Sequence, residues 1–153
     1  MSNDLMLPED DPFFPTEAIY PKLNPEMVER SLQYGTLKSC EAVQTITSRG
    51  DREVSFLVVL AGSVVVTGPG DGGHESVVTI HTKRQFSGEL NLFSQREVLV
   101  TTRAVTSVKL LEIAPRHFRE FVFAEPDIGE LIVRAVILRR MPGRVWLSPA
   151  CLN

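Results

Sequence analysis

Short runs of β-branched and other apolar residues, separated by turn residues at fairly even intervals, fill the chain between residues 36 and 113. Runs of this length and spacing are typical of an all-β sandwich or barrel. Glycine-containing turns separate them, as at 49–51, 61–63 and 68–73, because glycine adopts the positive φ that such turns need. The pattern predicts strands at 42–47, 56–60, 63–67, 76–81, 98–104 and 108–113.

The segment from residue 98 to residue 110 alternates with a period of two. Its even positions are apolar or small, whereas its odd positions include Arg103, Ser107 and Lys109. Successive side chains of a strand point to opposite faces of the sheet. We therefore expect the even positions to face inward and Arg103 to lie on the outward face.

A short helix is predicted ahead of the strands. Residues 24–26 have the sequence Asn-Pro-Glu, which supplies a helix N-cap, a proline at the first helical position and an acid in the first turn. We expect this helix to run to about Gln33 or Tyr34. Gly35 follows as its C-terminal stop.

Beyond the last predicted strand the pattern becomes helical. Pro115 begins a short helix that ends near Ala124, with Phe118 and Phe121 on one face. A longer helix is predicted at 128–141, and apolar residues lie on more than one of its sides. A barrel covers one stripe of a helix, so we expect a second partner, most simply the same helix of another copy in a homodimer. The alternative is a helix buried in the core.

The composition fits one globular domain. The 153 residues are 43% hydrophobic and 23% charged, which is enough to bury a core without disulfides or metals. We expect a poorly ordered, acidic and proline-rich leader at 1–19, the domain at 20–141 and a tail without periodicity at 142–153.

Charge and cysteine usage argue against several classes of protein. The formal net charge is -3 and no long block of Lys and Arg occurs, so direct binding to nucleic acid or to a membrane surface is not expected. No run approaches the roughly 20 apolar residues of a membrane span, and no signal-peptide pattern is present. Cys40 and Cys151 lie far apart, which indicates no disulfide framework and favours the cytoplasm.

One stretch interrupts the strand pattern. Residues 86–93 have the sequence Phe-Ser-Gly-Glu-Leu-Asn-Leu-Phe, which predicts a turn followed by a short helix. Gly88 lies ahead of a helical turn whose unpaired N–H groups can hold an anion, and Glu89 can accept hydrogen bonds from hydroxyl groups. These features outline a phosphate-and-sugar pocket. The alternative is that Glu89 is an ordinary first-turn acid, stabilised by the helix dipole.

The order of these parts resembles the cyclic nucleotide-binding domain family. The resemblance rests on the segments 50–64, 86–90 and 103–113, the last of which is followed by the helix that contains Phe118. It implies a mainly-β fold, an eight-stranded jelly-roll barrel with a leading helix, a short cassette helix and one or two C-terminal helices.

A narrower resemblance is to the sensor domain found ahead of bacterial thioredoxin-reductase-like flavoproteins. It rests on the amino-acid sequences of residues 86–92, 96–100 and 137–140. No flavin or nicotinamide fingerprint and no Cys-x-x-Cys occurs in the chain, so such an enzyme would be a separate segment.

In the cyclic nucleotide-binding family a Gly-Glu glutamate binds the ribose 2′-hydroxyl, and an arginine in a following Pro-Arg-Ala type sequence pairs with the cyclic phosphate. Gly88 and Glu89 match the first part, but Val98 falls in the arginine slot. Arg96 lies slightly before that slot. It reaches a phosphate if the loop at 94–95 is remodelled and is otherwise a solvated loop residue. The resemblance therefore implies as ligand-binding residues Phe86, Ser87, Gly88, Glu89, Leu90, Arg96, Val98 and Leu99.

The missing arginine separates two functions. Removing one partner of a buried charged pair costs on the order of 2–5 kcal/mol, or roughly 30- to several-thousand-fold in affinity. We expect either a regulatory sensor or a degenerate, ligand-free docking domain for an effector protein or domain. The sensor would bind cAMP, cGMP or a related phosphate ligand and relay the event through the C-terminal helix. Neither is an enzyme, and neither has a catalytic residue or a resident cofactor.

Two further classes are weighed against these. A metal-dependent cupin enzyme shares the jelly roll but needs closely spaced His ligands with a carboxylate. His74, His81 and His117 are scattered, so no metal site is predicted. A gene regulator needs a helix-turn-helix, and about 12 residues follow Met141, so we expect any DNA contact to come from another chain.

Overall fold

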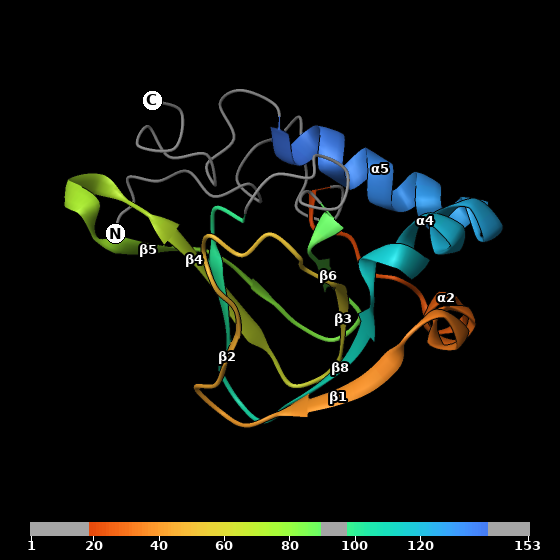
Figure 1. The fold of residues 1–153 in the computed structure, drawn as a ribbon, viewed down its shortest axis with the longest axis horizontal. Helices are drawn as coiled ribbons and strands as arrows, with labels where there is room; N and C mark the ends of the chain where they lie inside the picture. The colour runs from red at the N-terminus through yellow and green to blue at the C-terminus, as the bar shows by residue number, and fades with distance from the viewer. Residues whose placement is uncertain (1–18, 90–97, 141–153) are drawn as a thin grey trace.

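The computed structural model describes residues 19–89 and 98–140 (Figure 1). The leader expected at 1–19 lies outside this part apart from Ile19, and the tail expected at 142–153 lies wholly outside it. Most of the expected cassette helix also falls outside, at 90–97.

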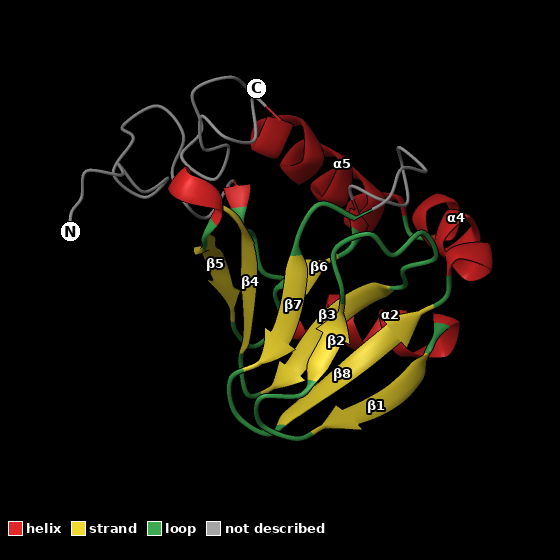
Figure 2. Cartoon of the chain, turned by 60° about the vertical axis from the view of Figure 1, so that its left-hand side comes forward, coloured by secondary structure: helices red, strands yellow, loops and turns green. Residues whose placement is uncertain are grey.

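Eight strands form two four-stranded antiparallel sheets in the described part of the chain. One sheet has the order β1 (Thr36–Cys40), β8 (Val108–Ile113), β3 (Phe56–Ala61) and β6 (Phe86–Ser87). The other has the order β2 (Thr45–Thr47), β7 (Thr101–Ala104), β4 (Val64–Pro69) and β5 (Glu75–His81). The sheets form the walls of a barrel (Figure 2). The predicted mainly-β jelly roll is confirmed.

Strand β3 is apolar without alternation because both of its faces are buried. Leu57 and Val59 point between the sheets into a cluster with Val64, Ala104 and Leu110. Its other face packs under the helices, in a larger cluster that includes Phe56, Val58, Phe86, Leu111, Phe118, Phe121, Ile128 and Ile132. A strand covered on both sides reads as a continuous apolar run.

The predicted alternation in β7 is confirmed. Thr102 and Ala104 are each 2% exposed, whereas the side chain of Arg103 between them is half-buried on the other face. The glycine turn at 61–63 is also confirmed. Gly62 has φ +83, and a Cβ there would lie 2.3 Å from the carbonyl oxygen of Ser107.

Two strands were not predicted. β1 was missed because most of its side chains are exposed, so it carries no apolar periodicity, and the strand expected at 42–47 is wrong in extent. β6 pairs two residues with Leu57 and Val58 of β3, where a turn was expected. Gly35 ends the first helix as expected, but with an extended φ of -147. A Cβ there would lie 2.3 Å from the Glu112 carbonyl oxygen, so close packing on β8 is what requires glycine.

The α-helices of the described part of the chain lie together at one side of the barrel (Figure 1). Helix α2 (Pro25–Ser31) is followed by the 3-10 turn η2 (Leu32–Tyr34), and a further 3-10 turn, η3 (Asp71–Gly73), joins β4 to β5. Asn24 caps α2, because its Oδ1 accepts a hydrogen bond of 2.8 Å from the backbone N–H of Met27. Helices α4 (Pro115–Ala124) and α5 (Pro126–Arg140) match the two predicted C-terminal helices closely. Within the described ranges no helix is long and apolar enough to cross a membrane.

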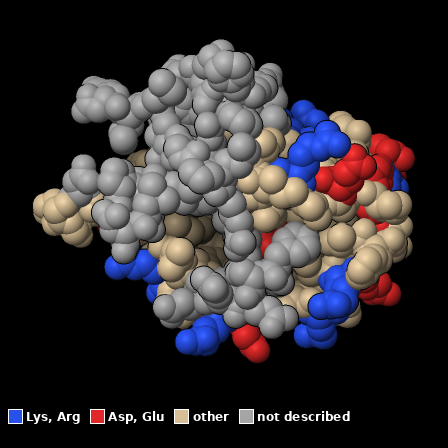
Figure 3. Space-filling model, turned by 90° about the horizontal axis from the view of Figure 1, so that it is seen from above, with Lys and Arg blue, Asp and Glu red and all other residues tan. Residues whose placement is uncertain are grey.

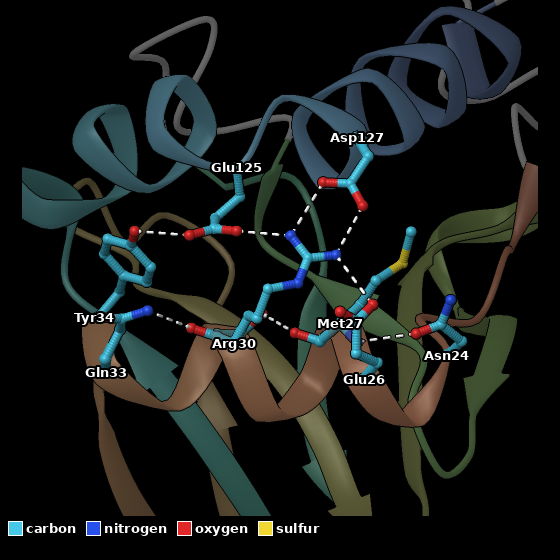
Figure 4. A network of polar contacts seen from close by, with 9 residues as sticks. Asn24, Glu26, Met27, Arg30, Gln33, Tyr34, Glu125 and Asp127 are labelled. Atoms are coloured by element: carbon cyan, nitrogen blue, oxygen red, sulfur yellow. Dashed lines mark hydrogen bonds and ion pairs between the residues drawn. The ribbon is translucent and has the colours of Figure 1, made fainter.

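One arginine ties α2 to the junction of α4 and α5 (Figure 4). The Nη1 atom of Arg30 donates to Glu125 at 2.5 Å, and its Nη2 atom donates to Asp127 at 2.6 Å. The hydroxyl of Tyr34 donates to the other oxygen of Glu125 at 2.8 Å. These bonds hold the elbow between the two C-terminal helices against the N-terminal helix.

Charges of both signs are interspersed on the face seen in Figure 3. Within the described residues of that face, Lys and Arg do not merge into one continuous basic patch. This distribution agrees with the formal net charge of -3.

Candidate functional site

The site begins where β6 leaves the sheet. Phe86 and Ser87 are held by pairing with β3, and the chain then turns at Gly88, which has φ +96. A Cβ on Gly88 would lie 2.5 Å from the carbonyl oxygen of Ser55. Two separate features therefore require glycine at this position. One is the left-handed backbone conformation, and the other is the close approach of the residue directly before β3. The turn delivers Glu89 into the interior.

Glu89 is 2% exposed and forms a buried ion pair with Arg139. Its Oε1 atom accepts a hydrogen bond from Nη1 of that arginine. A buried carboxylate needs such a partner, because an uncompensated charge in the interior is strongly unfavourable. The side chain of Glu89 is thus held in the interior by Arg139.

Arg139 comes from the last turn of α5 and is 5% exposed. Its Nε donates to the backbone carbonyl of Ile19 at 2.8 Å. The guanidinium carbon lies 4.8 Å from the centre of the Tyr20 ring and 5.2 Å from that of Phe86, distances at which cations are attracted to aromatic faces. Its Nη2 atom is buried and has no hydrogen-bond partner among the described residues.

Sequence reasoning missed Arg139, although a signal was present. Ile128, Ile132 and Val136 form the buried stripe of α5, and residue 139 continues this stripe at helical spacing. A charged residue on an apolar stripe requires a buried partner. The partner could not be named because it lies 50 residues away in sequence.

His81 lies in the same buried cluster, at the end of β5. It is 3% exposed, and the centroid of its ring lies 5.9 Å from that of the Tyr20 ring. In the described ranges its Nδ1 atom has no hydrogen-bond partner. Burial lowers the pKa of His81 from 6.5 to about 3, with a contribution from the positive charge of Arg139. The imidazole is therefore neutral near pH 7.

The histidines do not assemble into a metal site in the described part of the chain. The side chains of His74 and His117 are exposed, whereas that of His81 is 3% exposed. Among the described residues no group of three or more His, Cys, Asp and Glu side chains could hold a metal ion.

Val98 and Leu99, two of the other predicted site residues, lie within the described part of the chain. Val98 is 8% exposed, and its backbone is bonded to the turn at 50–51, with Gly50 N–H donating to its carbonyl at 2.8 Å. Leu99 is 67% exposed, so its side chain does not join the buried cluster around Glu89. Leu90 and Arg96 lie outside the described residues.

The model of the cyclic nucleotide-binding domain family matches residues 37–125, more than half of the chain. The chain belongs to the cyclic nucleotide-binding domain family. The matched part of this cyclic nucleotide-binding domain includes both sheets except for the first residue of β1, together with the cassette start and α4.

Curated relatives of this cyclic nucleotide-binding domain are cAMP-activated global transcriptional regulators. The regulator of Haemophilus influenzae is 31% identical over 103 residues, covering 65% of this chain and 45% of the relative. That of Salmonella typhimurium is 29% identical over 85 residues, covering 55% and 40%. The chain thus spans less than half the length of these relatives.

Solved structures share the fold of this domain. The catabolite activator protein of Thermus thermophilus superposes with a TM-score of 0.67 at 23% identity, covering 77% of this chain and 55% of that one. The c-di-GMP responsive global regulator of Xanthomonas campestris superposes with a TM-score of 0.64 at 22% identity, covering 76% and 57%. These likenesses establish the architecture.

Proposed function

We propose that this cyclic nucleotide-binding domain is a regulatory sensor, in which a cyclic nucleotide or related phosphate ligand binds next to Glu89 and the event is relayed through α5. The observation that carries the proposal is the buried pair between Glu89 and Arg139. It joins the start of the cassette to the last turn of the C-terminal helix. The curated relatives are cAMP-activated regulators, which supports this ligand class.

The relay follows from competition for one carboxylate. A ligand hydroxyl that hydrogen-bonds to Glu89 competes with Nη1 of Arg139 or shares the carboxylate with it. Ile128 and Ile132 anchor the first part of α5 in the core with no exposed area, whereas Arg139 holds the last turn by polar contacts. A ligand that prefers one arrangement of this pair shifts the population of α5 positions. The helix end is then the element that responds.

The proposal assigns the domain a binding role, without catalysis and without a resident cofactor. It places the protein in the cytoplasm, supported by the buried free thiol of Cys40. It also assigns any contact with nucleic acid to residues outside this domain. The formal net charge of -3 and the mixed charges on the one face that Figure 3 shows support this assignment.

A second candidate function is a docking domain that has lost its ligand. Val98, which is apolar and 8% exposed, favours it because this residue takes the slot of the phosphate-binding arginine. An apolar groove of about 510 Å³ runs along α4 and α5, lined among others by Phe123, Val133 and Ile137. Either a homodimer through 128–141 or an effector protein would use this surface.

Titration with cAMP and cGMP separates the two functions. A nucleotide at 100 times its dissociation constant stabilises the folded state by about 2.7 kcal/mol, which a thermal melt detects. We expect this shift in the unmodified protein and its loss in Glu89→Gln. The exposed Glu41 supplies the matched control, since Glu41→Gln should leave the shift unchanged. No shift with either nucleotide at millimolar concentration would reject the cyclic nucleotide sensor and favour the docking domain.

A further inference from the structure

Within the part of the chain that the structure describes, two buried polar atoms in the cluster around Glu89 lack hydrogen-bond partners. One is Nη2 of Arg139 and the other is Nδ1 of His81, on side chains that are 5% and 3% exposed. Buried polar atoms are almost always hydrogen-bonded, because leaving one unpaired costs free energy. Two such atoms in one cluster indicate a group that the described residues do not supply.

Both side chains lie against the ring of Tyr20. The guanidinium carbon of Arg139 is 4.8 Å from the ring centre, and the ring of His81 is 5.9 Å from it. Tyr20 belongs to the segment ahead of α2 rather than to either sheet. Movement of its side chain would therefore not break a strand pair.

The charges of this cluster favour an oxyanion. The Nη1 atom of Arg139 is committed to Glu89, but its Nη2 donor is available. A neutral imidazole can donate from Nδ1, and a protonated imidazole donates from both nitrogens. Guanidinium and imidazole donors together fit the oxygens of a phosphate group.

We propose that His81 and Arg139 form the anion-recognition subsite of this domain, with His81 as the residue that selects ligands whose oxyanion reaches both side chains. The proposal rests on the proposed binding of a phosphate ligand next to Glu89. It places the phosphate on the side of β5 and α5, and not at Val98. Arg139 then serves the ligand with one amino group and Glu89 with the other.

Proton uptake is the signature of this arrangement. Among the described residues, the charge that acts on His81 is that of Arg139, which is itself paired with Glu89, and the ring of Tyr20 packs against the imidazole. Glu89 and Arg139 cancel in charge, so an oxyanion gains net attraction when His81 takes up a proton. Bound anion would raise the pKa of His81 from its ligand-free value of about 3. Affinity then increases as the pH falls below the pKa of the bound state, by at most about tenfold per unit.

The test uses inorganic sulfate as the probe, since it stays a dianion across this range, with chloride at the same ionic strength as the control. The imidazole NMR signals of His81 are followed in the unmodified protein between pH 7 and pH 5. We expect a saturable shift with sulfate but not with chloride, and an affinity that rises toward pH 5. A sulfate titration that leaves the His81 signals unmoved would overturn the proposal.

Three variants distinguish recognition from packing. His81→Leu keeps the burial but removes the donor, and we expect roughly tenfold or more loss of sulfate affinity. His81→Asn keeps an amide donor near the position of Nδ1, so binding should persist without the pH dependence. His74→Asn, at an exposed histidine, should match the unmodified protein. Equal sulfate affinity in His81→Leu and the unmodified protein contradicts the subsite.

Titration of the same variants with cAMP separates this inference from the proposed function. Sulfate binding at His81 with no nucleotide binding supports the subsite and rejects the cyclic nucleotide sensor. Nucleotide binding that is unchanged in His81→Leu supports the sensor and rejects the subsite. Thermal melts without ligand verify that each variant is folded, and His81→Asn provides the second measurement if His81→Leu is not.

Discussion

At the scale of single residues, burial decides how much the loss of an ion pair changes the free energy of unfolding. Helix α5 carries two arginine–glutamate contacts of similar chemistry. The pair between Arg134 and Glu130 measures 2.8 Å and its side chains are 67% and 68% exposed, so it contributes about 0.3–0.5 kcal/mol at most. The pair between Arg139 and Glu89 is buried, and removing one partner there leaves an uncompensated charge, at a cost of about 3–5 kcal/mol. The second pair is therefore the one that can couple a ligand to the helix.

Gly88 yields a prediction at the same scale. In Gly88→Ala the alanine must adopt the left-handed backbone conformation of Gly88. Its Cβ would also lie 2.5 Å from the carbonyl oxygen of Ser55. Gly50, with φ +99 and no atom within 4 Å of its Cβ position, is the matched control. We expect Gly50→Ala to lower the free energy of unfolding by about 1–2 kcal/mol and Gly88→Ala by roughly 1–3 kcal/mol more, as measured by denaturant titration. Equal losses of unfolding free energy in the two variants would show that the contact with Ser55 does not destabilise Gly88→Ala.

At the scale of elements, the Arg30 contacts fix the angle at which α5 leaves α4. Arg30 reaches Glu125 at the end of α4 and Asp127 at the start of α5, while hydrophobic packing holds the middle of α5 on the sheet. The last turn depends on Arg139. The helix is therefore held at both ends by polar groups, and these are the contacts that we expect a ligand or a change in pH to alter.

The pH dependence of stability tests the first of these contacts. The hydrogen bond from Arg30 is the main cause that holds the pKa of Asp127 below its ordinary value of 3.8. A depressed folded-state pKa stabilises the protein above the unfolded pKa, and this stability is lost as the pH falls through the folded-state value. We expect Asp127→Asn to be less stable than the unmodified protein at pH 7, and the difference to shrink below pH 4. The measurement is the melting temperature of both proteins from pH 7 to pH 3. A difference that is constant with pH would contradict the role of the charge.

At the scale of the whole molecule, the helical side of the domain exposes apolar surface. Phe123 is 75% exposed and Ile137 is 58% exposed, and both line the groove of α4 and α5. Ile132 and Val136, on the opposite stripe, are almost fully buried in the core. One apolar side of α5 is thus buried against the barrel. The other apolar side is exposed in the groove, where a partner could cover it.

A homodimer through this groove is tested by mass. If a second copy covers it, Ile137→Glu should abolish a concentration-dependent increase in mass in analytical ultracentrifugation, because a carboxylate would be buried in the interface. Val77 on β5, which is 61% exposed, supplies the control Val77→Glu. A monomeric unmodified protein at high concentration, or a dimer that survives Ile137→Glu, would exclude this interface.

Much of the fold could be predicted from the sequence because its determinants are local. The cap at Asn24, the glycine turn at 61–63 and the alternation in β7 depend on neighbouring residues and on which face is buried. Strands β1 and β6 were not predicted, because they are defined by pairing with β8 and β3 and not by a pattern of apolar residues. Gly35 was recognised as a stop, but the carbonyl of β8 that excludes a side chain there could not be seen.

For the site, the sequence by itself determined the turn at Gly88 and the presence of a carboxylate at Glu89. The tertiary structure decided what that carboxylate does. Arg139 pairs with it from α5, and Tyr20 and His81 pack beside this pair from two other parts of the chain. Their properties come from burial that no local pattern encodes. A charge in water is nearly independent of its neighbours, whereas in the interior its stability depends on the partner that folding brings to it.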